Sequence, residues 1–141
     1  MPPEVLDYIK NQRVGVLAVE MMDGSPHAAT VHFAYTEQPF VLYFKSENKT
    51  KKAQPLDSKQ KVRASYVIGV SEAEMKTLQM DGFLERVSPE EKPVYDTVFY
   101  GRFSEKTKKD ADPTAAYLKF TPTWWRFTDW TLPQGKTIIE K

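Results

Sequence analysis

Two strand-like segments separated by a tight turn constrain the fold of this chain more than any other feature of its sequence. Residues 14–22 are almost continuously apolar, and Asp23-Gly24 follows as a strong turn signal, because glycine tolerates a positive φ. Residues 27–35 then return as a second strand. A hairpin this early excludes a doubly wound parallel sheet, in which helices connect the strands. Because both faces of residues 14–22 are apolar, we expect this strand to be buried on both sides.

The remaining chain continues the β pattern. We expect further strands at residues 40–44, 62–70, 75–87 and 117–130, and either a short strand or a tail at 136–139. In the fourth of the six expected strands, at residues 62–70, the residues that share one face are Val62, Ala64, Tyr66, Ile68 and Val70.

Short helices and one loop complete the expected elements. They are a short helix at residues 2–13, a short helix or helical turn at 48–57, a helix after the Ser88-Pro89-Glu90-Glu91 capping box, and a charged surface loop at 105–112. Pro93 should displace the start of the helix after the capping box, and Gly82 marks a bulge or a close backbone approach. The fold class predicted is mainly β: a six-stranded antiparallel barrel with short helices, formed by residues 1–141 as a single domain.

Composition excludes several kinds of chemistry. The chain has no cysteine, so disulfides, thiolate catalysis and cysteine-based metal sites are excluded. Twenty basic residues balance nineteen acidic ones, whereas proteins that act through global charge on nucleic acids or membranes are usually more lopsided. No apolar run approaches the ~20 residues that span a bilayer. The N-terminus does not resemble a secretory signal, so we expect a cytoplasmic protein without membrane contact.

One basic segment suggests a binding site for an anion. Residues 45–63 contain seven basic and two acidic residues, and the lysine-rich first part lies between an expected strand end and an expected helix start. Free backbone N–H groups at a helix start favour negative charge, and Ser46, Thr50, Lys51 and Lys52 add hydroxyl and ammonium groups, so a phosphate monoester would fit. The alternatives are a solvated lysine-rich loop and a patch that binds single-stranded nucleic acid.

No catalytic side chain stands out. His27 and His32 are five residues apart on one expected strand, so they point to opposite faces and cannot easily share a metal ion. We expect no metal site, and any chemistry should come from a bound cofactor.

Three segments together resemble the pyridoxamine 5'-phosphate oxidase-like family of FMN-binding split barrels. The first is residues 24–33, similar to the family's hairpin turn and second strand. The second is residues 42–56 (LYFKSENKTKKAQPL), similar to its phosphate segment, and the third is residues 79–82 (QMDG), similar to its Q-x-x-G stretch. The short, general-stress-protein-like relatives are the closer match, and residues 121–129 (TPTWWRFTD) look like their last strand.

The resemblance implies a set of FMN-binding residues. Ser46, Thr50, Lys51 and Lys52 would contact the phosphate, in place of the family's Thr, Ser and Arg-Lys. The backbone of Ala29, Thr30 and Val31 would flank the ring. The remaining candidates for cofactor binding are Lys45, Gln79, Trp124 and Trp125.

The same resemblance implies a homodimer with cofactor sites at the interface, and a flavin-dependent oxidoreductase acting on a small molecule. The family's oxidases have arginine in place of Ala29 and carry an Arg-Pro-x-Arg element that is absent here, so vitamin B6 oxidation is not expected. The alternatives are a deazaflavin or haem on the same fold, and a non-enzymatic flavin-binding or sensing module.

All three tryptophans lie within seven residues, at Trp124, Trp125 and Trp130. Neighbouring residues of a strand point to opposite faces, so one of Trp124 and Trp125 should pack in the core. The other should face the dimer interface or the cofactor.

Overall fold

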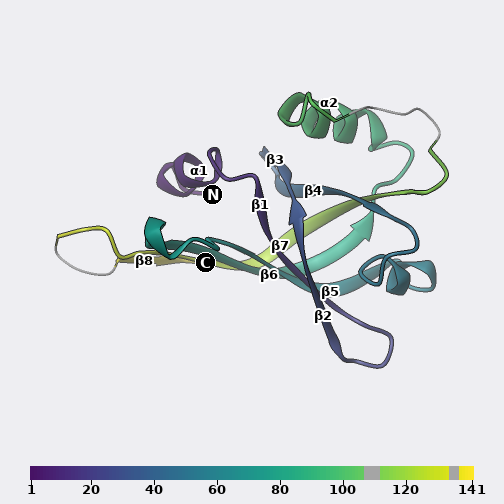
Figure 1. Ribbon diagram of the computed structural model, residues 1–141, viewed down its shortest axis with the longest axis horizontal. Helices are drawn as coiled ribbons and strands as arrows, with labels where there is room; N and C mark the ends of the chain where they lie inside the picture. The colour runs from purple at the N-terminus through teal and green to yellow at the C-terminus, as the bar shows by residue number, and fades with distance from the viewer. Residues whose placement is uncertain (107–111, 134–136) are drawn as a thin grey trace.

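The structure, a computed structural model, describes residues 1–106, 112–133 and 137–141. Its strands form one antiparallel sheet (Figure 1). They are β1 (Val14–Glu20), β2 (Pro26–His32), β3 (Ala34–Glu37), β4 (Phe40–Glu47), β5 (Lys61–Ile68), β6 (Lys76–Arg86), β7 (Ala115–Asp129) and β8 (Thr137–Glu140).

The sheet curls into a half-barrel whose two ends are neighbours in sequence. The strand order is β2-β1-β5-β6-β7-β4-β3, with β8 paired to β7. β2 therefore lies at one end of the order, although the chain continues from it directly into β3 at the other end. β2 and β4 also contact each other, without a hydrogen-bonded ladder among the described residues. We call the line where β2 meets β4 the seam.

The mainly β, split-barrel prediction is confirmed, but the predicted number of six strands is wrong. The described residues form eight strands, because the segment at 27–35 divides and residues 137–140 add β8. The division falls at Phe33, which is fully buried and donates its N–H to the Arg13 carbonyl (3.1 Å). Here the chain passes from β2, which pairs with β1, to β3, which pairs with β4. Residues 107–111 of the expected loop, and Lys136 of the expected last strand, lie outside the described residues.

Gly82 forms the predicted bulge and also the predicted close approach. The register between β6 and β7 shifts between Asp81 and Gly82, so that Asp81 pairs with Trp124 whereas Gly82 pairs with Pro122. An added Cβ on Gly82 would lie 2.1 Å from the Thr121 carbonyl oxygen. Pro122 has no N–H to donate to a ladder, and a bulge is one of the few strand positions that tolerates proline.

Two apolar clusters hold the fold together. The main one fills the curled sheet and includes Leu17, Phe44, Tyr66 and Phe120, all fully buried. The second lies between the outer face of β3 and β4 and the helix α2 (Lys92–Arg102), and is built around Tyr95 and Phe99. We expected the first strand to be buried on both sides, but the outward residues of β1 are only half-buried.

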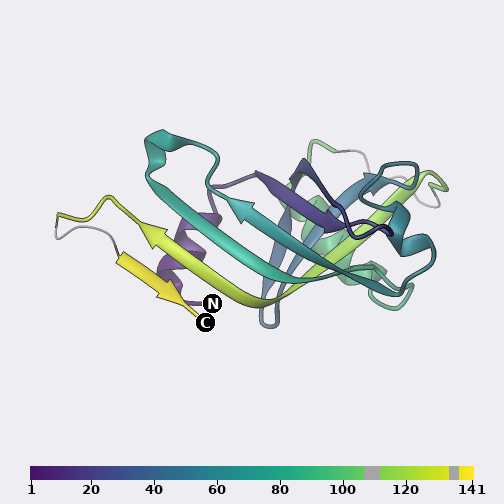
Figure 2. The same ribbon diagram turned by 90° about the horizontal axis from the view of Figure 1, so that it is seen from below.

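The helices are shorter than predicted. α1 spans Pro3–Ile9 and packs Val5 and Ile9 into the main cluster. The capping box at Ser88 and Glu91 forms, but α2 begins only at Lys92, with Pro93 in its first turn, as predicted for its displaced start. Two short 3-10 helices, η1 (Gln54–Asp57) and η2 (Glu72–Glu74), lie in connections. Figure 2 shows β6 and β7 running side by side, with β8 along the end of β7.

Candidate functional site

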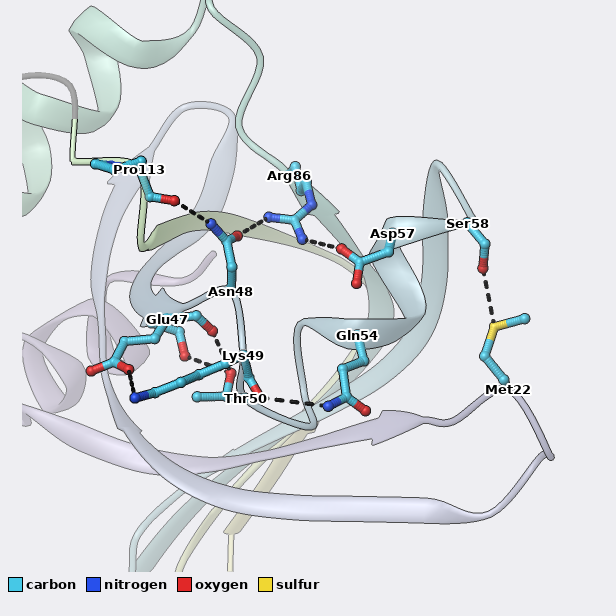
Figure 3. Close-up of polar contacts among 11 residues, drawn as sticks. Met22, Glu47, Asn48, Lys49, Thr50, Gln54, Asp57, Ser58, Arg86 and Pro113 are labelled. Atoms are coloured by element: carbon cyan, nitrogen blue, oxygen red, sulfur yellow. Dashed lines mark hydrogen bonds and ion pairs between the residues drawn. The ribbon is translucent and has the colours of Figure 1, made fainter.

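The end of β4 brings two of the predicted phosphate-binding hydroxyls together. Ser46 Oγ and Thr50 Oγ1 lie 3.1 Å apart. The Thr50 hydroxyl also donates to the Glu47 carbonyl (2.8 Å), and the Glu47 carboxylate pairs with Lys49 (3.3 Å), as Figure 3 shows. The Glu47 carboxylate therefore lies beside a lysine in an exposed ion pair, next to the two hydroxyls.

Of the short helix or helical turn predicted at residues 48–57, the helical turn forms and a longer helix does not. The chain forms successive turns and then only the four-residue η1, whose first turn contains Pro55. The N–H groups of Thr50, Ala53 and Gln54 are used in these turns, donating to Glu47, Thr50 and Lys51. A helix dipole cannot contribute to the site. Among the described residues, the N–H groups of Lys51 and Lys52 have no acceptor, so two backbone donors remain available.

The two lysines of the segment lie in different surroundings. Lys52 is half-buried, and burial lowers its pKa although the nearby Glu47 carboxylate opposes the shift. Lys51 is exposed, and its charge helps to lower the pKa of Asp23 in the β1–β2 turn, after the larger effect of the hydrogen bonds from Ser25. The segment thus carries one cation on the Glu47 side and one toward the hairpin.

Arg86, at the end of β6, fixes the position of this segment. Its guanidinium donates to Asn48 Oδ1 (2.8 Å) and Asp57 Oδ1 (2.7 Å), and the Asn48 amide donates to the Pro113 carbonyl (3.0 Å), as Figure 3 shows. Sequence reasoning missed Arg86, because nothing in the sequence shows that the end of β6 lies beside residues 48–57.

The three predicted ring-flanking residues lie on β2, along the seam. The Val31 side chain is buried in the core, and the Val31 carbonyl accepts a hydrogen bond from the buried Tyr66 hydroxyl (2.9 Å). Thr30 is exposed on the outer face, and Ala29 faces inward and is half-buried. The backbone of this stretch is therefore held rigidly from inside while its outer side remains accessible.

An open depression of about 550 Å³ lies between the end of β4 and the end of α2. Its lining residues are Lys45, Ser46, Glu47, Thr50 and Lys106. Lys45 Nζ donates to the Tyr100 hydroxyl of α2 (3.0 Å). Lys106 and Tyr100 were not predicted as site residues, because only the packing of α2 against β4 brings them here.

The remaining candidates lie elsewhere. Gln79 and Trp124 are on the outer face of β6 and β7, and Trp125 is buried on the inner face. Gln79 is seven residues from Arg86 along β6, or roughly 23 Å at the rise of an extended strand. One chain therefore does not bring Gln79 and Trp124 together with Ser46 and Thr50.

The same outer face has a groove of about 480 Å³ that crosses β1, β5 and β6. Glu20 accepts two hydrogen bonds from Arg63 (2.6 and 3.1 Å), and Asp81 accepts one from Ser65 (2.6 Å). The charged groups that border the groove are thus mutually satisfied.

The two histidines point to opposite faces of β2, as predicted. His27 faces inward, whereas His32 faces outward and meets the edge of Phe103 (ring centroids 5.4 Å apart). Among the residues that the structure describes, no three His, Asp or Glu side chains gather as a metal site, and no helix is long and apolar enough to cross a bilayer.

A curled antiparallel sheet that is open along one seam defines a split-barrel protein. The chain belongs to the pyridoxamine 5'-phosphate oxidase family, whose sequence profile matches residues 1–129. The resemblance found in the sequence is thereby confirmed.

Solved structures share the fold. A putative pyridoxamine 5'-phosphate oxidase from Listeria innocua is 18% identical, with a TM-score of 0.70 over 88% of this chain and 94% of that one. A pyridoxamine 5'-phosphate oxidase-related, FMN-binding protein from Nostoc punctiforme is 13% identical, with a TM-score of 0.71 over 100% and 98%. A heme-binding protein from Mycobacterium smegmatis is 13% identical, with a TM-score of 0.74, but the match covers 94% of this chain and only 53% of that one. No curated protein matches the sequence.

Proposed function

We propose that this chain binds FMN at the end of β4 and along β2, as part of a flavin-dependent oxidoreductase acting on a small molecule. The observation that carries the proposal is the pair of hydroxyls on Ser46 and Thr50, 3.1 Å apart in the segment that also contains Lys51 and Lys52. Hydroxyls, backbone N–H groups and ammonium groups are the donors that a phosphate monoester accepts. The family and the FMN-binding relative from Nostoc punctiforme support the choice of flavin.

In this proposal each part of the chain has a separate task. Ser46, Thr50, Lys51 and Lys52 hold the phosphate, and the β2 backbone at residues 29–31 orients the ring. Tyr66 keeps β2 in place through its hydrogen bond to Val31. When bound, the flavin would supply hydride transfer, which no side chain of the chain supplies by itself.

We further propose that the working form is a homodimer. Gln79 and Trp124 lie on the outer face of β6 and β7, away from β2, which orients the ring in this proposal, so we assign them to the flavin of another copy. The outer face of β6 and β7 would then cover the flavin of the partner subunit.

Haem is the second candidate, favoured by the likeness to the heme-binding protein from Mycobacterium smegmatis. His32 is the residue that fits an axial ligand, because its side chain is accessible at the seam. Partial desolvation, and then the charges of Lys106 and Arg13, lower its pKa. A neutral imidazole is the form that ligates a metal.

The deciding experiment titrates the purified protein with FMN, riboflavin and haem, followed by absorption and fluorescence. FMN should bind, and its absorption and fluorescence spectra should change on binding. The Lys51→Ala/Lys52→Ala double variant should bind FMN about 100-fold more weakly, because two charge-assisted contacts are lost, while riboflavin affinity changes less than about threefold.

A Lys10→Ala/Lys76→Ala double variant is the matched control, since it removes two ion-paired lysines outside the site. It should bind FMN as the unmodified protein does. Equal losses for FMN and riboflavin in the first variant would show that the lysines do not hold the phosphate. A strong Soret band without flavin binding would support haem instead.

A further inference from the structure

Two lysines outside the proposed phosphate contacts line the depression between β4 and α2. A phosphate monoester carries up to about two negative charges near neutral pH. Lys51 and Lys52, which the proposed function assigns to the phosphate and which do not line the depression, match that charge. Among the described residues that line it, Glu47 alone has a carboxylate, and this group is paired with Lys49. Lys45 and Lys106 line the same depression in addition.

Lys45 is held in place by an aromatic hydroxyl rather than by an acid. Its ammonium lies 3.0 Å from the Tyr100 hydroxyl and 5.3 Å from the centre of the Tyr100 ring. Other half-buried lysines of the sheet and α2 pair with carboxylates, as Lys119 does with Glu91 and Lys92 with Asp96. Lys45 has no carboxylate partner among the described residues, so its positive charge is oriented but not neutralised.

Lys106 approaches the depression from the other side. Its ammonium lies 5.3 Å from the centre of the Phe103 ring and 5.7 Å from that of Phe99. Its charge extends to the seam, where it helps to lower the pKa of His32 after the larger effect of burial. Arg13, the other cation near His32, is paired with Glu105 and does not line the depression, whereas Lys106 does.

We propose that the depression binds a second anionic group, a phosphate or carboxylate, between Lys45, oriented by Tyr100, and Lys106. This inference rests on the proposed function, which places the flavin phosphate on Ser46, Thr50 and the neighbouring lysines. The second group has two possible sources: the second phosphate of a dinucleotide flavin, or a separate anionic substrate. In both cases Lys45 of the phosphate segment selects the ligand together with Tyr100 on α2 and Lys106 in the connection after it.

The test compares riboflavin, FMN and FAD by calorimetry, and then titrates the FMN-loaded protein with inorganic phosphate. The variants are Lys106→Gln, the charge-preserving Lys106→Arg, and Lys10→Gln as a control of equal charge change just after α1. If the group belongs to the cofactor, FAD should bind more tightly than FMN, and Lys106→Gln should weaken FAD about tenfold while leaving FMN within about twofold. If it belongs to a separate ligand, FMN and FAD should bind alike, and Lys106→Gln should weaken phosphate binding to the loaded protein about tenfold. Lys106→Arg and Lys10→Gln should leave both measurements unchanged.

The inference is overturned if flavins bind and Lys106→Gln alters neither FAD nor phosphate binding, which leaves the proposed function intact. If no flavin binds, the proposed function fails. The inference then survives only if inorganic pyrophosphate binds the protein alone and Lys106→Gln weakens that binding; otherwise both fail.

Discussion

Replacing Gly82 by alanine should destabilise the protein through a steric clash at the bulge between β6 and β7. The new Cβ would lie 2.1 Å from the Thr121 carbonyl oxygen and 2.8 Å from the Pro122 Cα. Both neighbours are backbone atoms of the paired strand, so no side-chain rotation can relieve the overlap, and the strands must separate by about 1 Å. Forced backbone shifts in packed cores cost about 1–3 kcal/mol.

For a chain of this length, a loss of about 2 kcal/mol lowers Tm by roughly 8 °C. The assay is urea unfolding followed by circular dichroism and by tryptophan fluorescence, because Trp124 and Trp125 lie on the strand that moves. The urea midpoint should fall while the m-value stays constant.

Gly101→Ala is the matched control. Gly101 lies in α2, and an added Cβ there meets nothing within 4 Å. Alanine favours the helix, so this variant should be as stable as the unmodified protein or more stable by up to about 1 kcal/mol. The steric reasoning is refuted if Gly82→Ala keeps the midpoint of the unmodified protein, or if the two variants shift it by the same amount in the same direction.

Two further outcomes are expected. Trp125→Ala should cost about 3–5 kcal/mol in urea unfolding, because Trp125 is only 8% exposed, whereas Trp124→Ala on the outer face should cost about 1 kcal/mol or less; similar costs would contradict the assigned orientation. Burial, and then the charges of Lys106 and Arg13, lower the pKa of His32, so the unfolded chain takes up that proton first as the pH falls. The free energy of unfolding should therefore decrease as the pH drops below about 6.5, and His32→Gln should flatten this dependence; an unchanged pH slope in the variant would exclude the assignment.

Alternation along strands predicted much of the core. Val62, Ala64, Tyr66 and Ile68 are buried on one face, as their spacing indicates. The same pattern fails at Val70, which is 62% exposed, because Gly69 has a φ of 111° and the strand ends at Ile68. A periodic pattern shows which residues share a face, but it does not show where the backbone leaves the sheet.

The bulge explains why the sequence could not decide between Trp124 and Trp125. Phe120 and Trp125 are both buried although their numbers differ by five, because one extra residue in β7 switches the face between them. In an unbroken strand that starts from Phe120, Trp124 would face the core. Gly82 and Pro122 signal an irregularity there, but not its direction.

The phosphate segment was visible in the sequence because its hydroxyls and lysines are close together along the chain. The residues around this segment were not visible, since Arg86, Tyr100 and Lys106 come from β6, α2 and the connection after it. Contacts between residues that are 38 to 55 positions apart, such as Arg86 with Asn48 and Tyr100 with Lys45, depend on the finished sheet.

The seam between β2 and β4 has a consequence for the motions of the barrel. These two strands touch without a shared ladder among the described residues, so the barrel is joined there by side chains and by the passage of the chain through Phe33. A ligand that contacts Ser46 on β4 and the backbone of β2 would link these two strands directly. When the site is occupied, amide hydrogen exchange should slow most in β2 and β4. It should slow least in the β6–β7 pair, which is already joined by a hydrogen-bonded ladder.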